Sequence, residues 1–359
     1  MKAAVLKAFG TPLVIEDVPA PTPGMGAVVV DVVATGVLAY SGEVLSGQRQ
    51  YALELPCVPG GGAIGRVRAV GPDATKLAVG DWVYCDPTFR SRDDAANPDI
   101  TLQGISARGE GGLRLQRHFR DGAWAEQTRV PTENAIRIGA LDPAEAGRWV
   151  KMGSLLVPYG GFLAAKLQPG ETVVVSGATG GFGGAAVAVA LAMGAAWIVA
   201  TGRNAAALVD LERRFGPRVR TVRMTGDEVT DHAAIRAAAP GPIDCVFDIL
   251  PPAADATQAR AALMTVRPNG RIVLMGGINM QGGAGLELPY AWIMRNCITI
   301  HGQWMYPPHA ATLMANLIRA GLIDLTQYDV AEFPLDRANE AVAHAAATAG
   351  PFAMTVLRP

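Results

Sequence analysis

Glycines recur every third residue between positions 177 and 183, where an apolar run, 172–176, ends and a small-residue run, 184–193, begins. Glycine lets a chain turn sharply at a strand end, approach a pyrophosphate closely and pack the next helix against the sheet. The N-terminus of that helix offers N–H groups and a partial positive charge to phosphates. The segment therefore predicts a dinucleotide-binding turn, with a purely structural glycine turn as the alternative. The residues expected to contact the dinucleotide here are Gly177, Thr179, Gly180, Gly181, Phe182 and Gly183.

The end of the next strand-like run, 197–201, indicates which dinucleotide is bound. NAD-binding turns usually place an acidic residue there to hold the ribose 2′-hydroxyl, whereas this chain has Gly202 followed by Arg203. Loss of the carboxylate removes repulsion toward a 2′-phosphate, and a guanidinium can pair with that phosphate. We therefore expect NADP(H), with a solvated surface role for Arg203 as the alternative. The remaining residues expected at the cofactor are Thr201, Gly202, Arg203, Asn204, Leu250 and Gly276.

Strand and helix signals alternate from about residue 142 onward. Asp142 followed by Pro143 is typical of a helix start, with the aspartate as N-cap. The βαβαβ order predicts an α/β fold with a doubly wound parallel sheet of the Rossmann type. Strands are expected at 172–176, 197–201, 243–250 and 271–275, and helices at 184–193, 205–215 and 253–265.

The rest of the chain is rich in short strand signals. Residues 88–122 are long, polar and of mixed charge, which predicts either a functional loop or a small lobe. The tail, 300–359, contains helical signals at 310–320 and 335–347 and a strand signal at 353–357. Strands of the N-terminal part are expected at 27–33, 63–70, 82–84 and 126–130.

Length and composition bound the class of protein. The 359 residues favour two domains, and half of them are hydrophobic while only 18% are charged. A net charge of −1 argues against a nucleic-acid partner, and no apolar run is long enough to cross a membrane. Four widely spaced cysteines predict reduced, mostly buried thiols rather than disulfides. We expect a cytoplasmic protein that acts on a small molecule.

Several further motifs, in matching order, resemble the medium-chain dehydrogenase/reductase family. They are Pro59-Gly60, Gly80-Asp81-Trp82-Val83, the segment 121–126, the segment 167–175 and the segment 267–273. The resemblance implies a GroES-like, β-rich catalytic domain made of residues 1–149 plus 296–359. A Rossmann domain, 150–295, would be inserted into it. The resemblance also implies a homodimer or homotetramer.

The positions that hold catalytic zinc in many members of this family lack metal ligands here. Leu38 stands where a cysteine is expected, Gly61-Gly62 replaces a His-Glu pair, and Met152 and Gly153 occupy the third position. Catalytic zinc needs three nitrogen, sulfur or oxygen ligands from the protein. The segment 88–122 also lacks the closely spaced cysteines of a structural zinc lobe. We therefore expect no zinc and no other metal, a pattern that resembles the quinone oxidoreductase branch.

Without a metal, other groups must stabilise the negative charge that hydride transfer from nicotinamide C4 leaves on an acceptor. The candidate catalytic residues are Tyr40, Ser41 and Tyr51. Leu38, Trp304 and Tyr306 are expected in the substrate pocket. The alternatives are packed aromatic residues with satisfied hydroxyls, or catalysis by positioning alone.

Three functions fit this sequence. The first is NADPH-dependent reduction of a quinone or enone, which the zinc-free N-terminal half favours. The second is a zinc-free alcohol or carbonyl dehydrogenase, with Tyr40 as the electrophile. The third is a non-catalytic dinucleotide-binding protein, which the apolar Leu38-Ala39 pair suggests.

Overall fold

The computed structural model describes all residues, 1–359, and divides into two compact units. The β-rich unit comprises 1–153, 328–349 and 353–359, and the α/β unit comprises 154–327 and 350–352. The chain returns to the β-rich unit at residue 328, whereas the sequence suggested 296. The difference arises because β16 (Thr299–Gly302) pairs with a strand of the α/β unit.

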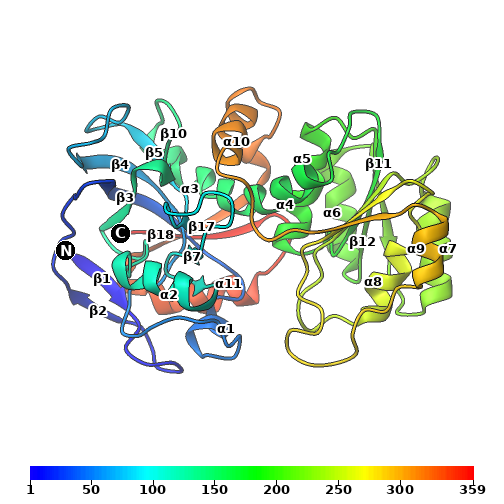
Figure 1. The fold of residues 1–359 in the computed structure, drawn as a ribbon, viewed down its shortest axis with the longest axis horizontal. Helices are drawn as coiled ribbons and strands as arrows, with labels where there is room; N and C mark the ends of the chain where they lie inside the picture. Colours follow the sequence, from blue (N-terminus) through cyan, green and yellow to red (C-terminus); the bar gives the residue numbers. More distant parts are fainter. The chain divides into compact units, whose positions relative to one another are not determined.

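A seven-stranded sheet organises the β-rich unit, in the order β10-β5-β4-β3-β18-β17, with β9 also paired to β3 (Figure 1). The long strand β3 (Ala27–Val37) lies at its centre and pairs with three neighbours. The C-terminal strand β18 runs antiparallel to β3, so the tail completes the same sheet. The other strands are β4 (Ala63–Val70), β5 (Trp82–Cys85), β9 (Gln127–Pro131), β10 (Ala135–Arg137), β17 (Asp329–Pro334) and β18 (Ala353–Arg358).

Smaller elements surround this sheet. The strands β1 (Lys2–Val5) and β2 (Val14–Asp17) form an antiparallel pair. The expected cap is present, because the Asp142 side chain accepts from the Ala144 N–H at 3.0 Å and opens the short 3₁₀ helix Pro143–Glu145. The helices of this unit are α1 (Ser41–Leu45), α2 (Gly109–His118), α3 (Ala146–Trp149) and α11 (Ala338–Ala347).

Residues 88–122 form a small lobe, one of the two predicted alternatives, and Gly104 and Ile105 of this lobe line a pocket. Three short strands make an antiparallel sheet that α2 covers. Strands of two or three residues are too short to show a sequence period. Arg92 and Arg117 form ion pairs with Glu133 and Glu54, outside the lobe, which accounts for part of its mixed charge. The strands are β6 (Thr88–Arg90), β7 (Ile100–Leu102) and β8 (Ser106–Ala107).

The α/β unit contains the expected doubly wound parallel sheet, in the order β13-β12-β11-β14-β15-β16. The central strand β11 (Thr172–Ser176) is buried along its whole length, which explains its unbroken apolar sequence. The small-residue helix α5 (Gly181–Ala192) packs on β11 and β12. The remaining strands are β12 (Trp197–Gly202), β13 (Val219–Arg223), β14 (Cys245–Asp248), β15 (Arg271–Leu274) and β16.

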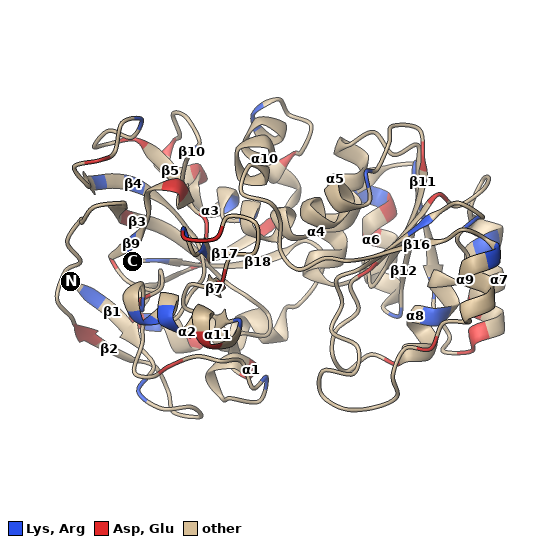
Figure 2. Cartoon of the chain, in the orientation of Figure 1, with Lys and Arg blue, Asp and Glu red and all other residues tan.

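Helices flank this sheet, and the structure adds elements that the sequence did not indicate. Besides β13 and β16, these are α4 (Met152–Ala164), α7 (Glu228–Ala238) and α9 (Tyr290–Arg295). The expected helices are present as α6 (Ala205–Phe215), α8 (Ala256–Leu263) and α10 (Ala310–Arg319). Figure 2 shows acidic and basic residues interspersed along both units. None of the helices has the length and apolarity that a membrane span requires.

Candidate cofactor and acceptor sites

The glycine turn joins β11 to α5 in a conformation that only glycine satisfies at two positions. Gly177 has φ of +86°, the left-handed region. A Cβ on Gly183 would lie 2.0 Å from the Gly177 carbonyl oxygen. Gly180 is the N-cap of α5 and has no side chain to occupy the N–H groups of the first turn. The structure therefore presents the backbone arrangement that phosphate groups require.

The end of β12 lies against this turn. The Ala178 N–H donates to the Thr201 carbonyl oxygen at 2.9 Å. A Cβ on Gly202 would lie 2.4 Å from Thr179 Cγ2, so any side chain at position 202 would require Thr179 to shift. Arg203 is exposed. The Asn204 side chain accepts from the Ala207 N–H at 3.1 Å and caps α6, so this residue has a structural role.

A second arginine, which sequence analysis missed, lies on the neighbouring strand. Arg223 is the register partner of Gly202 in the parallel pair β12–β13, and its side chain is exposed. Paired residues of adjacent parallel strands project from the same face of a sheet. Arg223 therefore projects from the face on which a Gly202 Cβ would meet Thr179. The strand β13 had no sequence signal, so nothing linked this arginine to the glycine turn.

The carboxyl ends of β14 and β15 lie beside the turn as well. Leu250 Cδ2 would lie 3.4 Å from a Cβ on Gly177, and the Gly277 N–H donates to the Leu250 carbonyl oxygen. A Cβ on Gly276 would lie 2.7 Å from Asp248 Oδ2. Gly177 and Leu250 thus lie at the carboxyl ends of the paired strands β11 and β14, the usual position of the ligand crevice in such sheets.

Asp248, at the end of β14, was also missed. Its side chain is 2% exposed, and its Oδ1 has no hydrogen-bond partner. Burial raises the pKa of this carboxyl to about 6, although hydrogen bonds from Ser176 and Leu250 oppose the shift. A buried carboxyl thus lies next to the cofactor residues.

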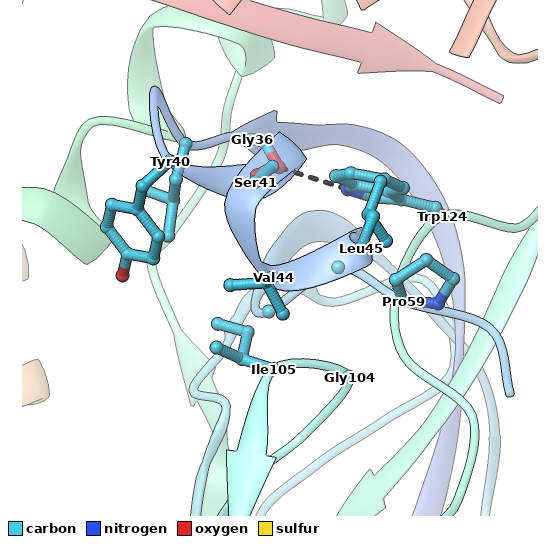
Figure 3. Close-up of a pocket in the computed structure, with 12 residues that line it drawn as sticks. Gly36, Tyr40, Ser41, Val44, Leu45, Pro59, Gly104, Ile105 and Trp124 are labelled. Carbon is cyan, nitrogen blue, oxygen red and sulfur yellow. Dashed lines mark hydrogen bonds between the residues drawn. The ribbon is translucent and has the colours of Figure 1, made fainter. Parts of the chain in front are cut away.

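The β-rich unit contains a mostly apolar pocket at the end of β3 (Figure 3). Three residues predicted for the acceptor site, Leu38, Tyr40 and Ser41, line it together with Gly61. The Trp124 Nε1 donates to the Gly36 carbonyl oxygen at 3.1 Å and fixes one wall. Leu38 and Gly61, the residues at two positions where zinc ligands were considered, therefore lie in one pocket.

Tyr40 lines this pocket, whereas Tyr51, the third predicted catalytic residue, is not among its lining residues. The Arg49 guanidinium lies 4.0 Å from the centroid of the Tyr40 ring and donates to the Tyr51 hydroxyl at 3.3 Å. Its Nε also donates to Glu43 Oε2 at 2.8 Å. Burial raises the pKa of the Tyr40 hydroxyl, so this phenol keeps its proton. Figure 3 shows the hydroxyl of Tyr40 directed away from Trp124.

The two aromatic residues expected in the substrate pocket belong to the α/β unit. Tyr306 is 2% exposed, and a Cβ on Gly160 of α4 would lie 2.8 Å from its Cα. Trp304 is 43% exposed. Tyr306 therefore has the packing of a core residue within this unit.

The residues present do not fit a zinc ion. Leu38, Gly61, Gly62 and Gly153 offer no side-chain donor, and no three His, Cys, Asp or Glu side chains gather as ligands anywhere in the structure. Cys57, Cys85 and Cys245 are buried, and burial raises the pKa of each thiol to about 12.

Two polar residues beside these positions escaped sequence analysis. The hydroxyl of Tyr84 would lie 3.5 Å from a Cβ on Gly62 and 3.2 Å from a Cβ on Gly153. The Nζ of Lys151 lies 4.4 Å from the centroid of the Tyr328 ring, and burial lowers its pKa to about 7. Tyr84 lies within an apolar strand, and no sequence spacing relates it to residue 153.

Two family models match the chain in the order that the fold requires. Residues 24–140 match the alcohol dehydrogenase GroES-like domain, and residues 181–320 match the zinc-binding dehydrogenase domain. The chain belongs to the medium-chain dehydrogenase/reductase family. The predicted architecture, a GroES-like domain with a Rossmann-type parallel sheet, is thereby confirmed.

Curated alcohol dehydrogenases match this chain in sequence over part of their length. An alcohol dehydrogenase of Rhizobium meliloti (strain 1021) is 33% identical over 195 residues, 54% of this chain and 55% of that protein. An alcohol dehydrogenase of Geobacillus stearothermophilus is 32% identical over 54% of this chain and 56% of its own. The chain thus spans about half the length of the curated relatives it matches.

Solved structures share the fold over the whole chain. An alcohol dehydrogenase of Aeropyrum pernix is 20% identical with a TM-score of 0.80, covering 100% of both chains. A structure from Sinorhizobium meliloti 1021, described as a zinc-binding dehydrogenase bound to NADP, is 21% identical with a TM-score of 0.81. It covers 100% of this chain and 99% of that one. At these identities the likeness concerns the fold.

Proposed function

We propose that this protein is a metal-independent, NADPH-dependent oxidoreductase that reduces a quinone or an enone. The observation that carries the proposal is the donor-free set Leu38, Gly61, Gly62 and Gly153. A zinc ion polarises a carbonyl as a Lewis acid, and these residues cannot hold one. A conjugated acceptor suits such a site because its π system delocalises the charge that hydride addition creates.

The preference for NADP(H) rests on the end of β12. Because position 202 is a glycine, no carboxylate is present there to bind the ribose 2′-hydroxyl of NAD or to repel the 2′-phosphate of NADP. A side chain at this position would also collide with Thr179. Arg203 and Arg223 provide two guanidinium groups for a 2′-phosphate. The curated relatives include an NAD-dependent alcohol dehydrogenase of Sulfurisphaera tokodaii, 28% identical, so the preference requires a direct test.

The bound dinucleotide would supply a hydride from nicotinamide C4. The chain's own residues bind and orient the acceptor. Leu38 and Val44 form apolar walls that exclude water, and Ser41 lies in the same pocket. Tyr40 keeps its proton and lines the pocket, and its ring packs against Arg49, which donates to the Tyr51 hydroxyl.

A second candidate function is zinc-free reduction of a simple ketone or aldehyde. The curated relatives described above are named alcohol dehydrogenases, which favours this candidate. The same pocket would serve, and the acceptor carbon would be a carbonyl carbon. Product analysis separates the two, because an enone reduced at C=C yields a ketone and one reduced at C=O yields an allylic alcohol.

The proposed function is tested by incubating the protein with NADPH or NADH and a panel of quinones, enones, ketones and aldehydes. We expect NADPH oxidation with quinones or enones. Turnover restricted to simple ketones and aldehydes would favour the second candidate. Tight NADPH binding without turnover of any acceptor would instead indicate a non-catalytic dinucleotide-binding protein.

We also propose that the protein forms a homodimer or homotetramer. The supporting feature is β16, an edge strand of the six-stranded sheet, with exposed Met294 on the nearby helix α9. Unpaired edges and exposed apolar side chains favour association. Light scattering after size-exclusion chromatography gives the mass directly, and a monomeric mass would refute the proposal.

A further inference from the structure

The hydroxyl of Tyr84 lies at a junction of two glycines that are far apart in sequence. It would be 3.5 Å from a Cβ on Gly62 and 3.2 Å from a Cβ on Gly153. The backbone of Tyr84 is fixed between two strands, with Ile64 of β4 and Ile136 of β10 as register partners. Two residues without side chains thus border one buried phenol oxygen.

This junction adjoins the acceptor pocket. Gly61, which lines the pocket, is the neighbour of Gly62. The Thr35 hydroxyl donates to the Gly62 carbonyl oxygen at 2.8 Å and holds this loop in place. On the other side, a Cβ on pocket-lining Gly36 would lie 2.9 Å from Val150 Cγ1, three residues before Gly153. Gly62 is thus connected to the pocket lining through Gly61, and Gly153 through the contact between Val150 and Gly36.

We propose that Tyr84 is a catalytic residue of the acceptor site, where its hydroxyl donates a hydrogen bond and then a proton to the acceptor oxygen. The inference rests on the proposed reductase function. In this proposal the Tyr84 hydroxyl, which lies beside Gly62 and Gly153, polarises the acceptor carbonyl in place of a zinc ion. Tyr40 then orients the acceptor, because its ring is held against Arg49.

The step balances with the proposed cofactor. The acceptor gains a hydride at carbon from the reduced dinucleotide, which is oxidised, and its oxygen gains the proton of the Tyr84 hydroxyl. For a ketone the C=O π bond breaks and an alcohol forms. For an enone the hydride adds to the β-carbon, the C=C π pair shifts to the bond between the α-carbon and the carbonyl carbon, and the C=O π pair moves to the oxygen. The oxygen takes the Tyr84 proton, and the resulting enol tautomerises to the ketone. The Tyr84 phenolate recovers its proton from solvent.

The first test compares Tyr84→Phe with Tyr290→Phe, which changes an 81% exposed tyrosine on α9. We expect Tyr84→Phe to lower kcat by about 10²- to 10³-fold, the usual contribution of a general acid. Tyr290→Phe should leave kcat unchanged. An active wild-type protein with full activity in Tyr84→Phe would overturn this inference alone. A wild-type protein that reduces no acceptor would reject the proposed function instead.

The second test uses binding rather than turnover. Quenching of tryptophan fluorescence measures the affinity of the cofactor-free protein for a quinone or ketone, with Trp124 in the pocket wall as reporter. We expect Tyr84→Phe to weaken binding by about tenfold, the loss of one hydrogen bond. Gly153→Ala, which forces the Tyr84 hydroxyl to shift, should weaken it to a smaller extent. Unchanged affinity in both variants, with unchanged thermal unfolding, would contradict the role.

Discussion

Gly202 and Thr179 are in contact so close that a Cβ on Gly202 would lie 2.4 Å from Thr179 Cγ2. This contact holds the end of β12 against the glycine turn. It also disfavours an acidic side chain at position 202, which would bind the ribose 2′-hydroxyl of NAD. The proposed preference for a 2′-phosphate and the packing of the turn therefore depend on the same two residues.

That coupling predicts the effect of Gly202→Ala. The added methyl group should lower the free energy of unfolding by about 1–3 kcal/mol, the usual cost of overpacking. Thr179→Gly in the same chain removes the atoms that clash and should restore most of the loss. Denaturant unfolding of the two single variants and the double variant measures the coupling. Additive changes would show that the two residues do not conflict.

Arg203 and Arg223 should separate NADPH from NADH. Replacing either by alanine removes one charge-assisted partner of a 2′-phosphate, so we expect the Kd for NADPH to rise by about tenfold or more. The Kd for NADH should stay the same, because that dinucleotide has no 2′-phosphate. Calorimetric titration of each variant with both dinucleotides checks this. Equal weakening of both would mean that the arginines act on something other than the 2′-phosphate.

Asp248→Asn should stabilise the protein above pH 6. The pKa of this carboxyl is about 6 in the folded protein, above its ordinary value of 3.8, so the folded state binds more protons between these values. The wild-type contribution to stability therefore falls as the pH rises through that window. The neutral amide removes the cost, which is at most about 3 kcal/mol at pH 8. Urea unfolding at pH 4 and pH 8 measures it, and a variant that is less stable at pH 8 would refute the prediction.

Lys151→Met should also stabilise the protein, with the opposite pH dependence. The pKa of Lys151 is about 7 when folded and 10.5 when exposed, so the unfolded state binds more protons between these values. Wild-type stability should then rise with pH from about 7 toward 10, and the variant should lack this rise. The exposed Lys76 provides a matched control, because Lys76→Met should leave the pH dependence intact. Identical pH profiles of unfolding for wild type and Lys151→Met would contradict the prediction.

The sequence was sufficient for the parts of the fold that rest on local patterns. The glycine turn and strands 172–176 and 63–70 match the structure closely, because buried strands and tight turns have strong residue preferences. The polar helix α7 and the strand β13 were missed, since neither has a clear apolar period. Short strands of the 88–122 lobe were missed for the same reason.

The residues of the candidate site were likewise predicted where a local motif marked them and missed where it did not. Leu38, Tyr40 and Ser41 were found from a motif position, and the structure gathers them in one pocket. Arg223 and Tyr84 were missed because their importance depends on neighbours distant in sequence. Arg223 gains its place from strand pairing with Gly202, and Tyr84 from contacts with Gly62 and Gly153. Such relations appear only once the chain is folded.

The central claim is that acceptor reduction here needs no metal ion. Its most direct test measures NADPH oxidation by protein that has been dialysed against a strong chelator, together with the zinc content by mass spectrometry. We predict undiminished turnover at a metal content far below one ion per chain. Loss of turnover on chelation and its recovery with added zinc would contradict the account.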